Sequence, residues 1–411
     1  MISFEIPSYV LTQLEPYAHL ASAVMRPQAR HYDEHEHERP TPFIQAIWPL
    51  ERERLQHLQA MAAHEANEGE PDSDILTYIL LAELLSWGDT GQFLARPGGR
   101  LGGTAVEAVG TPAQKAQFLK RFAESEEPVW GAMAITEPDA GSDNSAMRTT
   151  AVLDPETNEW ILNGQKIFIT SGALSLQESK GICIVWATVD PDAGRQGIKS
   201  FVVEAYTPGV TVSSGMDKLG IRASDTVVIS FANARLPYDN VLGSFEVENT
   251  TKGFIGAMKT FDASRPAVAA SAMGIARAAI EITKELLAEA GIVLDYAKPR
   301  HELTAVERDL LCMEAQYKHA WLLTLKATEA IMHGRSSREA SSMAKAAAGT
   351  AVVQITQTAV ALLGPLGYTR HTLIEKLMRD AKINDIYEGT RQINLLIVAR
   401  AILGYSRREL K

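Results

Sequence analysis

The stretch EWILNGQKIFIT, residues 159 to 170, is rich in β-branched and aromatic residues and contains an Asn-Gly pair. This composition is typical of β-strands, and Asn-Gly is a turn signal. Similar segments follow, separated by Asp-Pro-Asp-Ala-Gly and Thr-Pro-Gly turns: GICIVWATVD (181–190), IKSFVVEA (198–205), VTVSS (210–214) and TVVISFANARLP (226–237). Their spacing predicts a small antiparallel barrel or sandwich over about residues 130 to 245.

The segments on either side of this region have a helical pattern. Before it, ILTYILLAELLSW (75–87) predicts a buried helix, and GTPAQKAQFLKRFAE offers Thr111 as an N-cap and Pro112 as the first helical residue. After it come three long segments rich in Ala, Leu, Met and Ile. The predicted fold is mainly α with a central β-domain: an N-terminal helical domain (1–129), a middle β-domain (130–245) and a C-terminal four-helix bundle (246–411).

Composition narrows the class of protein. The 411 residues carry a formal charge of -10, which argues against nucleic acid as a partner of the whole surface. No apolar run approaches the roughly 18 to 20 residues of a membrane span, and the first residues lack a signal-peptide pattern. The two cysteines lie far apart in the sequence and suggest no disulfide framework. We therefore expect a cytoplasmic protein. The histidine-rich cluster HYDEHEHER (31–39) is interpreted as a solvated charged segment, and no metal is predicted.

Three segments carry groups suited to binding. The loop AMAITEPDAGSDNS (132–145) is dense in hydrogen-bond donors and can hold a heteroaromatic ring edge or an anion, or can be only a turn. In KIFITSGA (166–173), Phe168 and Thr170 lie on one side of a strand and suit a planar cofactor, although a core strand is an equal alternative. In FDASRP (261–266), Asp262 and Arg265 either pair with each other or clamp a ligand.

The segment DAKINDIYEGTRQIN (380–394) places Glu388 just before an apolar run. An acid near a helix N-terminus is stabilised by the helix dipole, so Glu388 is either a helix-start acid or a reactive group. The residues alone leave both open. The sequence contains no G-x-G-x-x-G after a strand, no G-x-x-x-x-G-K-[ST] and no G-x-S-x-G.

Six blocks in this order resemble the acyl-CoA dehydrogenase family over roughly residues 80 to 404. They are GTPAQKAQFLKRF, AITEPDAGSD, NGQKIFITSG, LGIRASDTVVISFANARLPYDNVLG, FDASRPAVAASAMGIARAA and EKLMRDAKINDIYEGTRQI. The resemblance implies the three-domain order given above, with FAD bound noncovalently between the β-domain and the bundle. It also implies dehydrogenation of an acyl-CoA between Cα and Cβ, a step of fatty acid or lipid catabolism such as β-oxidation.

The resemblance assigns roles to individual residues. Glu388 matches the catalytic base, whose pKa must be raised by desolvation while the backbone N–H of Glu388 and a flavin ribityl hydroxyl hold the enolate. The residues implied for FAD are Met133, Ile135, Thr136, Gly141, Ser142, Phe168 (where tryptophan is usual), Thr170, Thr390 and Gln392. Those implied for the acyl-CoA are Ser142, Asp262, Arg265 and Gly389.

The chain departs from the family in the groups that reach the FAD of a neighbouring subunit. Val293 stands where an arginine is usual, Tyr296-Ala297 replaces Phe-Gly, Ala361 replaces a glutamine, and Gly364-Pro365-Leu366-Gly367 replaces a glycine-rich turn. We infer either an α2β2 heterotetramer with a related subunit or a divergent homo-oligomer in which Arg300 or His301 takes over. The resemblance implies an electron-transfer flavoprotein as acceptor.

Other functions remain open at this point. An acyl-CoA oxidase uses the same base and flavin and passes electrons to oxygen. A flavin monooxygenase of this fold generally lacks the glutamate of IYEGT. A non-catalytic subunit of a heteromeric acyl-CoA dehydrogenase would explain the departures but not the retained Glu388.

Overall fold

The computed structural model describes residues 6–63, 73–247, 252–405 and 409. Its N-terminal part is helical, with one π-helical turn, η1, at Ala21–Met25. The α-helices are α1 (Ser8–Leu20), α2 (Arg26–Glu34), α3 (Thr41–Ala63), α4 (Ser73–Ala95), α5 (Arg100–Val109) and α6 (Pro112–Glu124). Thr111 caps α6 as predicted, because its hydroxyl accepts from the Gln114 N–H at 3.2 Å while the Gln114 side chain accepts from the Thr111 N–H at 3.0 Å.

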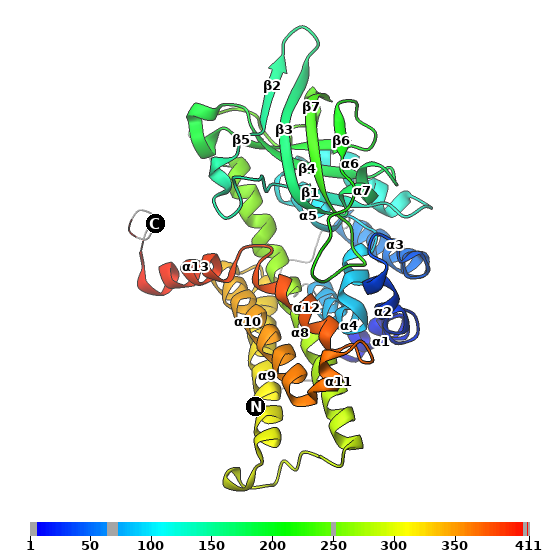
Figure 1. Ribbon diagram of the computed structural model, residues 1–411. Helices are drawn as coiled ribbons and strands as arrows, with labels where there is room; N and C mark the ends of the chain where they lie inside the picture. The colour runs from blue at the N-terminus through cyan, green and yellow to red at the C-terminus, as the bar shows by residue number, and fades with distance from the viewer. Residues whose placement is uncertain (1–5, 64–72, 248–251, 406–408, 410–411) are drawn as a thin grey trace.

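The middle of the chain forms one seven-stranded sheet curved into a half-barrel (Figure 1). Its strands are β1 (Gly131–Ala134), β2 (Thr150–Asp154), β3 (Glu159–Thr170), β4 (Ile182–Thr188), β5 (Ile198–Glu204), β6 (Val210–Val212) and β7 (Thr226–Pro237). They lie in the order β1-β4-β2-β3-β7-β6, with β5 paired to β4.

The half-barrel differs from the predicted antiparallel arrangement at β1 and β2. Both pair with β4 in parallel, and the remaining pairs are antiparallel. Turn signals identify antiparallel hairpins, whereas parallel neighbours are joined by long connections that leave no local signature. The sequence therefore predicted the strands but not all of their partners.

The C-terminal part is again helical. It contains α8 (Lys252–Glu289), α9 (Ala305–Met332), α10 (Arg338–Leu363), α11 (Pro365–Tyr368), α12 (Ile374–Ala381), the 3-10 turn η6 (Lys382–Asp385) and α13 (Arg391–Leu403). Helices α8, α9 and α10 pack around a shared apolar core, and α13 extends away from the body of the protein (Figure 1). A Cβ added at Gly349 of α10 would lie 2.6 Å from the Asn384 carbonyl oxygen, so this glycine allows η6 to pack closely on α10.

Within the described residues, α10 is the one helix long and apolar enough to cross a membrane, by length and composition alone. This departs from the expectation that no segment approaches that length. The reason is that alanines with few charges raise the average hydropathy of a helix that has no continuous apolar run. The buried residues of α10, including Ala348, Val352 and Ile355, pack into the core formed with α8 and α9, as in a bundle helix.

Candidate active site

Glu388 lies in the connection between η6 and α13. Its backbone is left-handed, with φ of 53°, and the next residue, Gly389, is left-handed as well, with φ of 96°. The N-cap of α13 is Thr390, whose hydroxyl accepts from the Ile393 N–H at 3.3 Å. Glu388 is therefore not the residue that caps this helix. Two successive left-handed residues turn the chain sharply at Glu388.

The Glu388 carboxylate is held by α8. Its Oε2 accepts a hydrogen bond from the Ser264 hydroxyl at 2.5 Å. Burial raises the pKa of Glu388, whereas the Ser264 hydrogen bond and the charges of Arg265, Lys345 and Arg100 oppose that rise. The group is thus a carboxylate made more basic by burial and surrounded by donors and cations.

The same turn is fixed from two further helices. The carbonyl oxygen of Gly389 accepts from Lys345 Nζ of α10 at 2.6 Å and from Asn394 Nδ2 of α13 at 2.8 Å. Burial lowers the pKa of Lys345 to about 8, and the charge of Glu388 works against that fall. A base on this turn therefore has a rigid support.

Asp262 and Arg265 lie about one turn apart on α8, and Ser264 lies between them in the sequence. Arg265 Nη1 contacts Asp262 Oδ1 at 2.5 Å, so of the two alternatives left open by the sequence, the structure shows the ion pair. Arg265 is buried and Asp262 is half-buried. Of the other residues in the C-terminal part, Thr390 is half-buried, and Gln392 is exposed on the first turn of α13.

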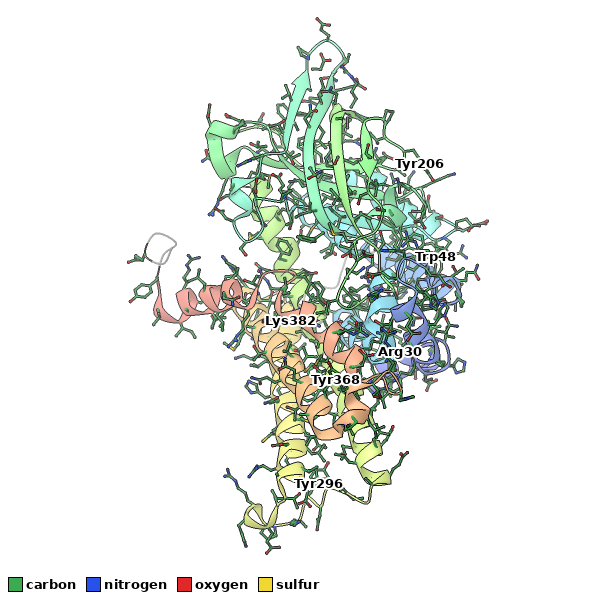
Figure 2. All side chains as sticks on the ribbon, viewed as in Figure 1. Arg30, Trp48, Tyr206, Tyr296, Tyr368 and Lys382 are labelled. Atoms are coloured by element: carbon green, nitrogen blue, oxygen red, sulfur yellow. The ribbon has the colours of Figure 1, made fainter. Side chains whose placement is uncertain are left out.

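The block EKLMRD positions the turn that carries Glu388, a role the sequence did not reveal. Lys376 is buried and lies 2.5 Å from both Asp89 of α4 and Asp380 of α12. Asp380 also accepts from the Ile221 N–H at 2.6 Å, which ties the β-domain to α12. Lys382, which opens η6, lies in the region between the β-domain and the bundle helices in Figure 2.

The loop after β1 is organised by a buried ion pair that sequence reasoning also missed. Lys166 Nζ lies 2.7 Å from Glu137 Oε1, and both side chains are almost fully buried. Glu137 also accepts from the N–H groups of Arg148 and Thr149, at 2.6 and 3.0 Å, so one carboxylate holds both ends of the loop. The available signal was a charged residue in each of the two short segments TEP and QKIF, next to Pro138 and to Ile167.

The loop and β3 lie side by side, because the Ile167 N–H donates to the Thr136 carbonyl at 2.9 Å. The pairing of β3 with β7 is irregular between Lys166 and Ile169, and Phe168 there has φ of 61° and a side chain 64% exposed. Phe168 is thus turned out of the sheet as a bare aromatic face beside Thr136.

The other predicted cofactor residues of the β-domain lie on β1, on the loop that follows it and at the end of β3. The hydroxyls of Thr136, Ser142 and Thr170 make no hydrogen bond to any residue that the structure describes. Gly141 is exposed, and nothing lies within 4 Å of an added Cβ there. Ile135 is buried and Met133 half-buried. Free hydroxyls, an open glycine and an exposed ring fit a planar heteroaromatic group such as the flavin of FAD.

Helix α5 connects the β-domain to the turn of Glu388. A Cβ added at Gly102 would lie 2.6 Å from the Ala132 carbonyl, so α5 packs directly on β1. Burial raises the pKa of both Tyr387 and Glu388, and the charge of Arg100, at the start of the same helix, opposes both rises. One helix therefore borders the strand that leads to Ile135 and Thr136 and also faces Glu388.

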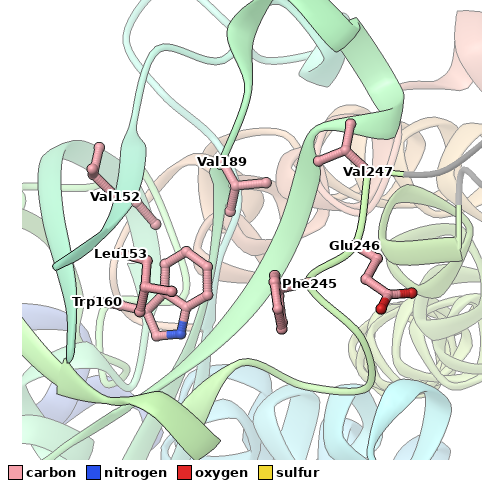
Figure 3. A pocket seen from close by; sticks show the side chains of 8 residues that line it. Val152, Leu153, Trp160, Val189, Phe245, Glu246 and Val247 are labelled. Atoms are coloured by element: carbon pink, nitrogen blue, oxygen red, sulfur yellow. The ribbon is translucent and has the colours of Figure 1, made fainter. Parts of the chain in front are cut away.

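A separate small pocket of about 280 Å³ lies on the β-domain (Figure 3). Apolar side chains form most of its wall, and Glu246 lies at one side; the lining residues are Ala151, Val152, Leu153, Trp160, Val189, Phe245, Glu246 and Val247. None of these is a predicted site residue. Two exposed groups, His31 with His35 and Glu38, and Glu36 with His37 and Asp217, have spacings that could hold a metal ion, but exposed acids commonly lie this close without one.

Two of the departures from the family pattern, Val293 and Tyr296-Ala297, lie on the surface at the connection between α8 and α9, whereas Ala361 and Gly364–Gly367 lie at the end of α10 and in α11. Val293 is 70% exposed, and Tyr296, labelled at one end of the protein in Figure 2, is 62% exposed. The Tyr296 hydroxyl donates to Glu314 at 2.7 Å and accepts from Lys284 at 3.0 Å, which fixes it to the bundle.

Comparison with known proteins identifies relatives over most of the chain. The N-terminal, middle and C-terminal domain families of acyl-CoA dehydrogenases match residues 14–126, 132–234 and 251–403. The short-chain-specific acyl-CoA dehydrogenase of Megasphaera elsdenii is 34% identical over 336 residues, which cover 82% of this chain and 84% of that protein.

Two solved structures share the complete fold. Butyryl-CoA dehydrogenase from Megasphaera elsdenii superimposes with a TM-score of 0.84 at 30% identity, covering 98% of this chain and 100% of that one. A chain in the structure of the electron-transferring flavoprotein of Acidaminococcus fermentans superimposes with a TM-score of 0.82 at 30% identity and the same coverage.

Proposed function

The chain belongs to the acyl-CoA dehydrogenase family, and from that premise we propose that it dehydrogenates an acyl-CoA thioester with Glu388 as the catalytic base. The observation that carries this proposal is the setting of the Glu388 carboxylate. It accepts from Ser264 at 2.5 Å, its pKa is raised by burial, and its backbone is turned into the left-handed region.

This setting suits removal of the weakly acidic α-proton of a thioester. A carboxylate in water is too weak a base for that step, and burial makes it stronger. Negative charge then develops on the thioester oxygen, and a backbone N–H aimed at that oxygen stabilises it. The backbone N–H of Glu388 is the proposed donor. Asp262, Arg265, Gly389 and Ser142 remain the proposed substrate contacts, with the ion pair orienting Arg265 beside Glu388.

The residues proposed to hold FAD are those predicted from the sequence. Phe168 offers an aromatic face, and the free hydroxyls of Thr136, Ser142 and Thr170 offer hydrogen bonds to a ring edge. Met133, Ile135 and Gly141 complete this side, and Thr390 and Gln392 approach from the C-terminal part. FAD, when bound, supplies the acceptor for the hydride that leaves the β-carbon.

We further propose that the chain works in an oligomer. Apolar side chains of α13 and its end are exposed: Leu395, Ile402, Leu403 and Tyr405. Exposed apolar surface of this kind marks contact with a partner. The exposed Val293 and Tyr296 support the α2β2 arrangement, in which a related subunit contributes the groups that are absent here. The electron-transfer flavoprotein remains the proposed acceptor.

The occupancy of FAD tests the two-chain arrangement. The chain is expressed alone and together with a related subunit, and the ratio of flavin to protein is measured by absorbance after gel filtration. We expect low occupancy alone and full occupancy in the complex. Full and tight occupancy in the chain alone contradicts the α2β2 arrangement.

The base is tested by Glu388→Gln, which keeps the shape of the side chain and removes its basicity. We expect the rate of substrate-dependent flavin bleaching to fall by about 100- to 10,000-fold, the range of general-base catalysis. The control is Asp385→Asn, which neutralises a carboxylate three residues earlier that pairs with Lys382 at 3.2 Å. Unchanged bleaching in Glu388→Gln would place the base elsewhere.

A further inference from the structure

A cluster of buried guanidinium groups lies between α3, α4 and the start of α5. Arg96 is only 2% exposed, and Arg54 and Arg100 are half-buried. The buried carboxylate in the cluster, Glu51, pairs with Arg54 at 3.0 Å. Three guanidinium groups thus share one carboxylate. Buried charges in proteins are normally paired with an opposite charge, so this cluster has more cations than anions to pair them.

Several N–H groups of this cluster have no partner within the described residues. They are Nε of Arg54, Nε and Nη1 of Arg96 and Nη1 of Arg100, all of them buried. Arg96 Nη2 donates to the Tyr78 hydroxyl at 3.1 Å. The Arg100 guanidinium lies over the Phe93 ring and makes no hydrogen bond or ion pair to the described part of the chain. Buried polar groups in proteins are almost always hydrogen-bonded, so these donors call for an acceptor.

The electrostatics of the surrounding groups agree with an excess of positive charge. Burial, followed by repulsion from Arg96, lowers the pKa of Arg100 to about 10. The pKa of Tyr78 is lowered although its burial acts in the opposite direction, because the charges of Arg96, Arg100 and Arg54 favour the phenolate. The Tyr78 shift is therefore the one that reports the positive charge of the neighbouring guanidinium groups, and the repulsion from Arg96 contributes to the Arg100 shift after burial.

The cluster faces the turn that carries Glu388. Besides burial and Arg96, the groups that act on the pKa of Arg100 are Tyr78 and then the carboxylates of Glu51 and Glu388, all three of which raise it. Arg100 itself is left-handed, with φ of 50°, and follows two glycines. The first of these, Gly98, has φ of 115°, so the chain turns tightly there before α5 begins.

We propose that Arg96 and Arg100 form an anion-binding subsite for the far end of the acyl group, so that the preferred substrates are CoA thioesters whose acyl chain carries a carboxylate. This inference rests on the proposed function, because it takes Glu388 to mark the reacting end of the acyl chain. A guanidinium pairs with a carboxylate through two parallel hydrogen bonds, and the free N–H groups provide the donors. An apolar acyl chain would leave them buried and unpaired, which disfavours it.

The test compares binding of straight-chain acyl-CoAs of increasing length with binding of their ω-carboxy counterparts. Dissociation constants are measured by calorimetry on the FAD-loaded Glu388→Gln protein, so that no turnover occurs. At one chain length we expect the ω-carboxy form to bind about 10- to 100-fold tighter, a range typical of a charge-assisted pair. Arg100→Gln and Arg96→Gln should each reduce this preference about tenfold.

Three further arms make the result decisive. Arg121→Gln removes a guanidinium that pairs with Glu204 at 3.2 Å, outside this cluster, and should keep the preference. Arg100→Lys keeps the charge without the planar fork and should give an intermediate preference; it also replaces Arg100→Gln if that variant does not fold. Binding of CoA alone should be the same in wild type and Arg100→Gln.

Two outcomes would overturn the subsite. One is equal binding of both members of every pair. The other is an equal loss of affinity for CoA alone in Arg100→Gln, which would assign the cluster to the CoA phosphates. Failure of the base assignment is separate, because it appears as persistent flavin bleaching in Glu388→Gln while the calorimetric preference is unaffected.

Discussion

Removing the hydroxyl of Ser264 should shift the pH dependence of the reaction in a predictable direction. In the folded protein, this hydroxyl donates to Glu388 Oε2 at 2.5 Å and stabilises the ionised carboxylate. Ser264→Ala removes that stabilisation, so the pKa of Glu388 rises further above its ordinary value. Since the base acts in its ionised form, the acidic limb of the profile of kcat/KM against pH should move to higher pH.

The size of the shift follows from the strength of the hydrogen bond. A hydrogen bond to a charged group contributes about 1.5–3 kcal/mol, and about 1.4 kcal/mol corresponds to one pKa unit. Ser264 and Glu388 are both half-buried, so water replaces part of the lost interaction. We therefore expect the lower end of the range, a shift of about one pH unit.

The assay is the initial rate of acyl-CoA oxidation with an artificial electron acceptor at subsaturating substrate, measured across the pH range in which the enzyme is folded. Ser22→Ala is the control, because Ser22 is exposed and, among the described residues, its hydroxyl bonds to the nearby carbonyls of Ala18 and His19 alone. An acidic limb that stays in place, or moves to lower pH, would refute the link between Ser264 and the base.

Two other changes test the supports of the site. Lys166→Met leaves the buried Glu137 charge without its cation and should lower the free energy of unfolding by about 3–5 kcal/mol in urea titrations. The double variant Glu137→Gln/Lys166→Met removes both charges and should recover part of that loss. No loss in the single variant would mean that the backbone donors of Arg148 and Thr149 suffice. Gly349→Ala places a Cβ 2.6 Å from the Asn384 carbonyl oxygen and should lower the free energy of unfolding by about 1–3 kcal/mol. It should also reduce kcat/KM, because the added methyl group displaces η6. An unchanged melting temperature would show that the contact can relax.

The fold could be predicted from the sequence because its three parts differ in local pattern. Periodic apolar residues and the N-cap at Thr111 identify helices, and β-branched runs such as EWILNGQKIFIT identify strands, before any tertiary contact is known. The parallel pairing of β1 and β2 with β4 could not be predicted, because it joins segments far apart along the chain. The helical N-terminal part, the half-barrel and the C-terminal helical domain are confirmed, as is membership of the family.

The site was accessible to sequence reasoning only where a motif is local. Glu388, Phe168 and the TEPDAGSD loop are recognisable within short segments. The hydrogen bond from Ser264 to Glu388, the Lys166–Glu137 ion pair and the pairing of Lys376 with Asp89 all join residues distant in sequence. These contacts exist only in the folded chain, so no short segment predicts them. Arg96 and Arg100 were overlooked for the same reason, although two arginines in FLARPGGR directly after an apolar helix were a visible signal.

The backbone at Glu388 has a consequence for comparing related chains. A glutamate with φ of 53° occupies a region that glycine and asparagine enter more easily, so the native state carries conformational strain of about 1 kcal/mol or more at this residue. Selection for stability alone would replace it. A related chain released from the reaction should therefore drift toward glycine or asparagine here, and the identity of this residue can show which subunit of an assembly still performs proton abstraction.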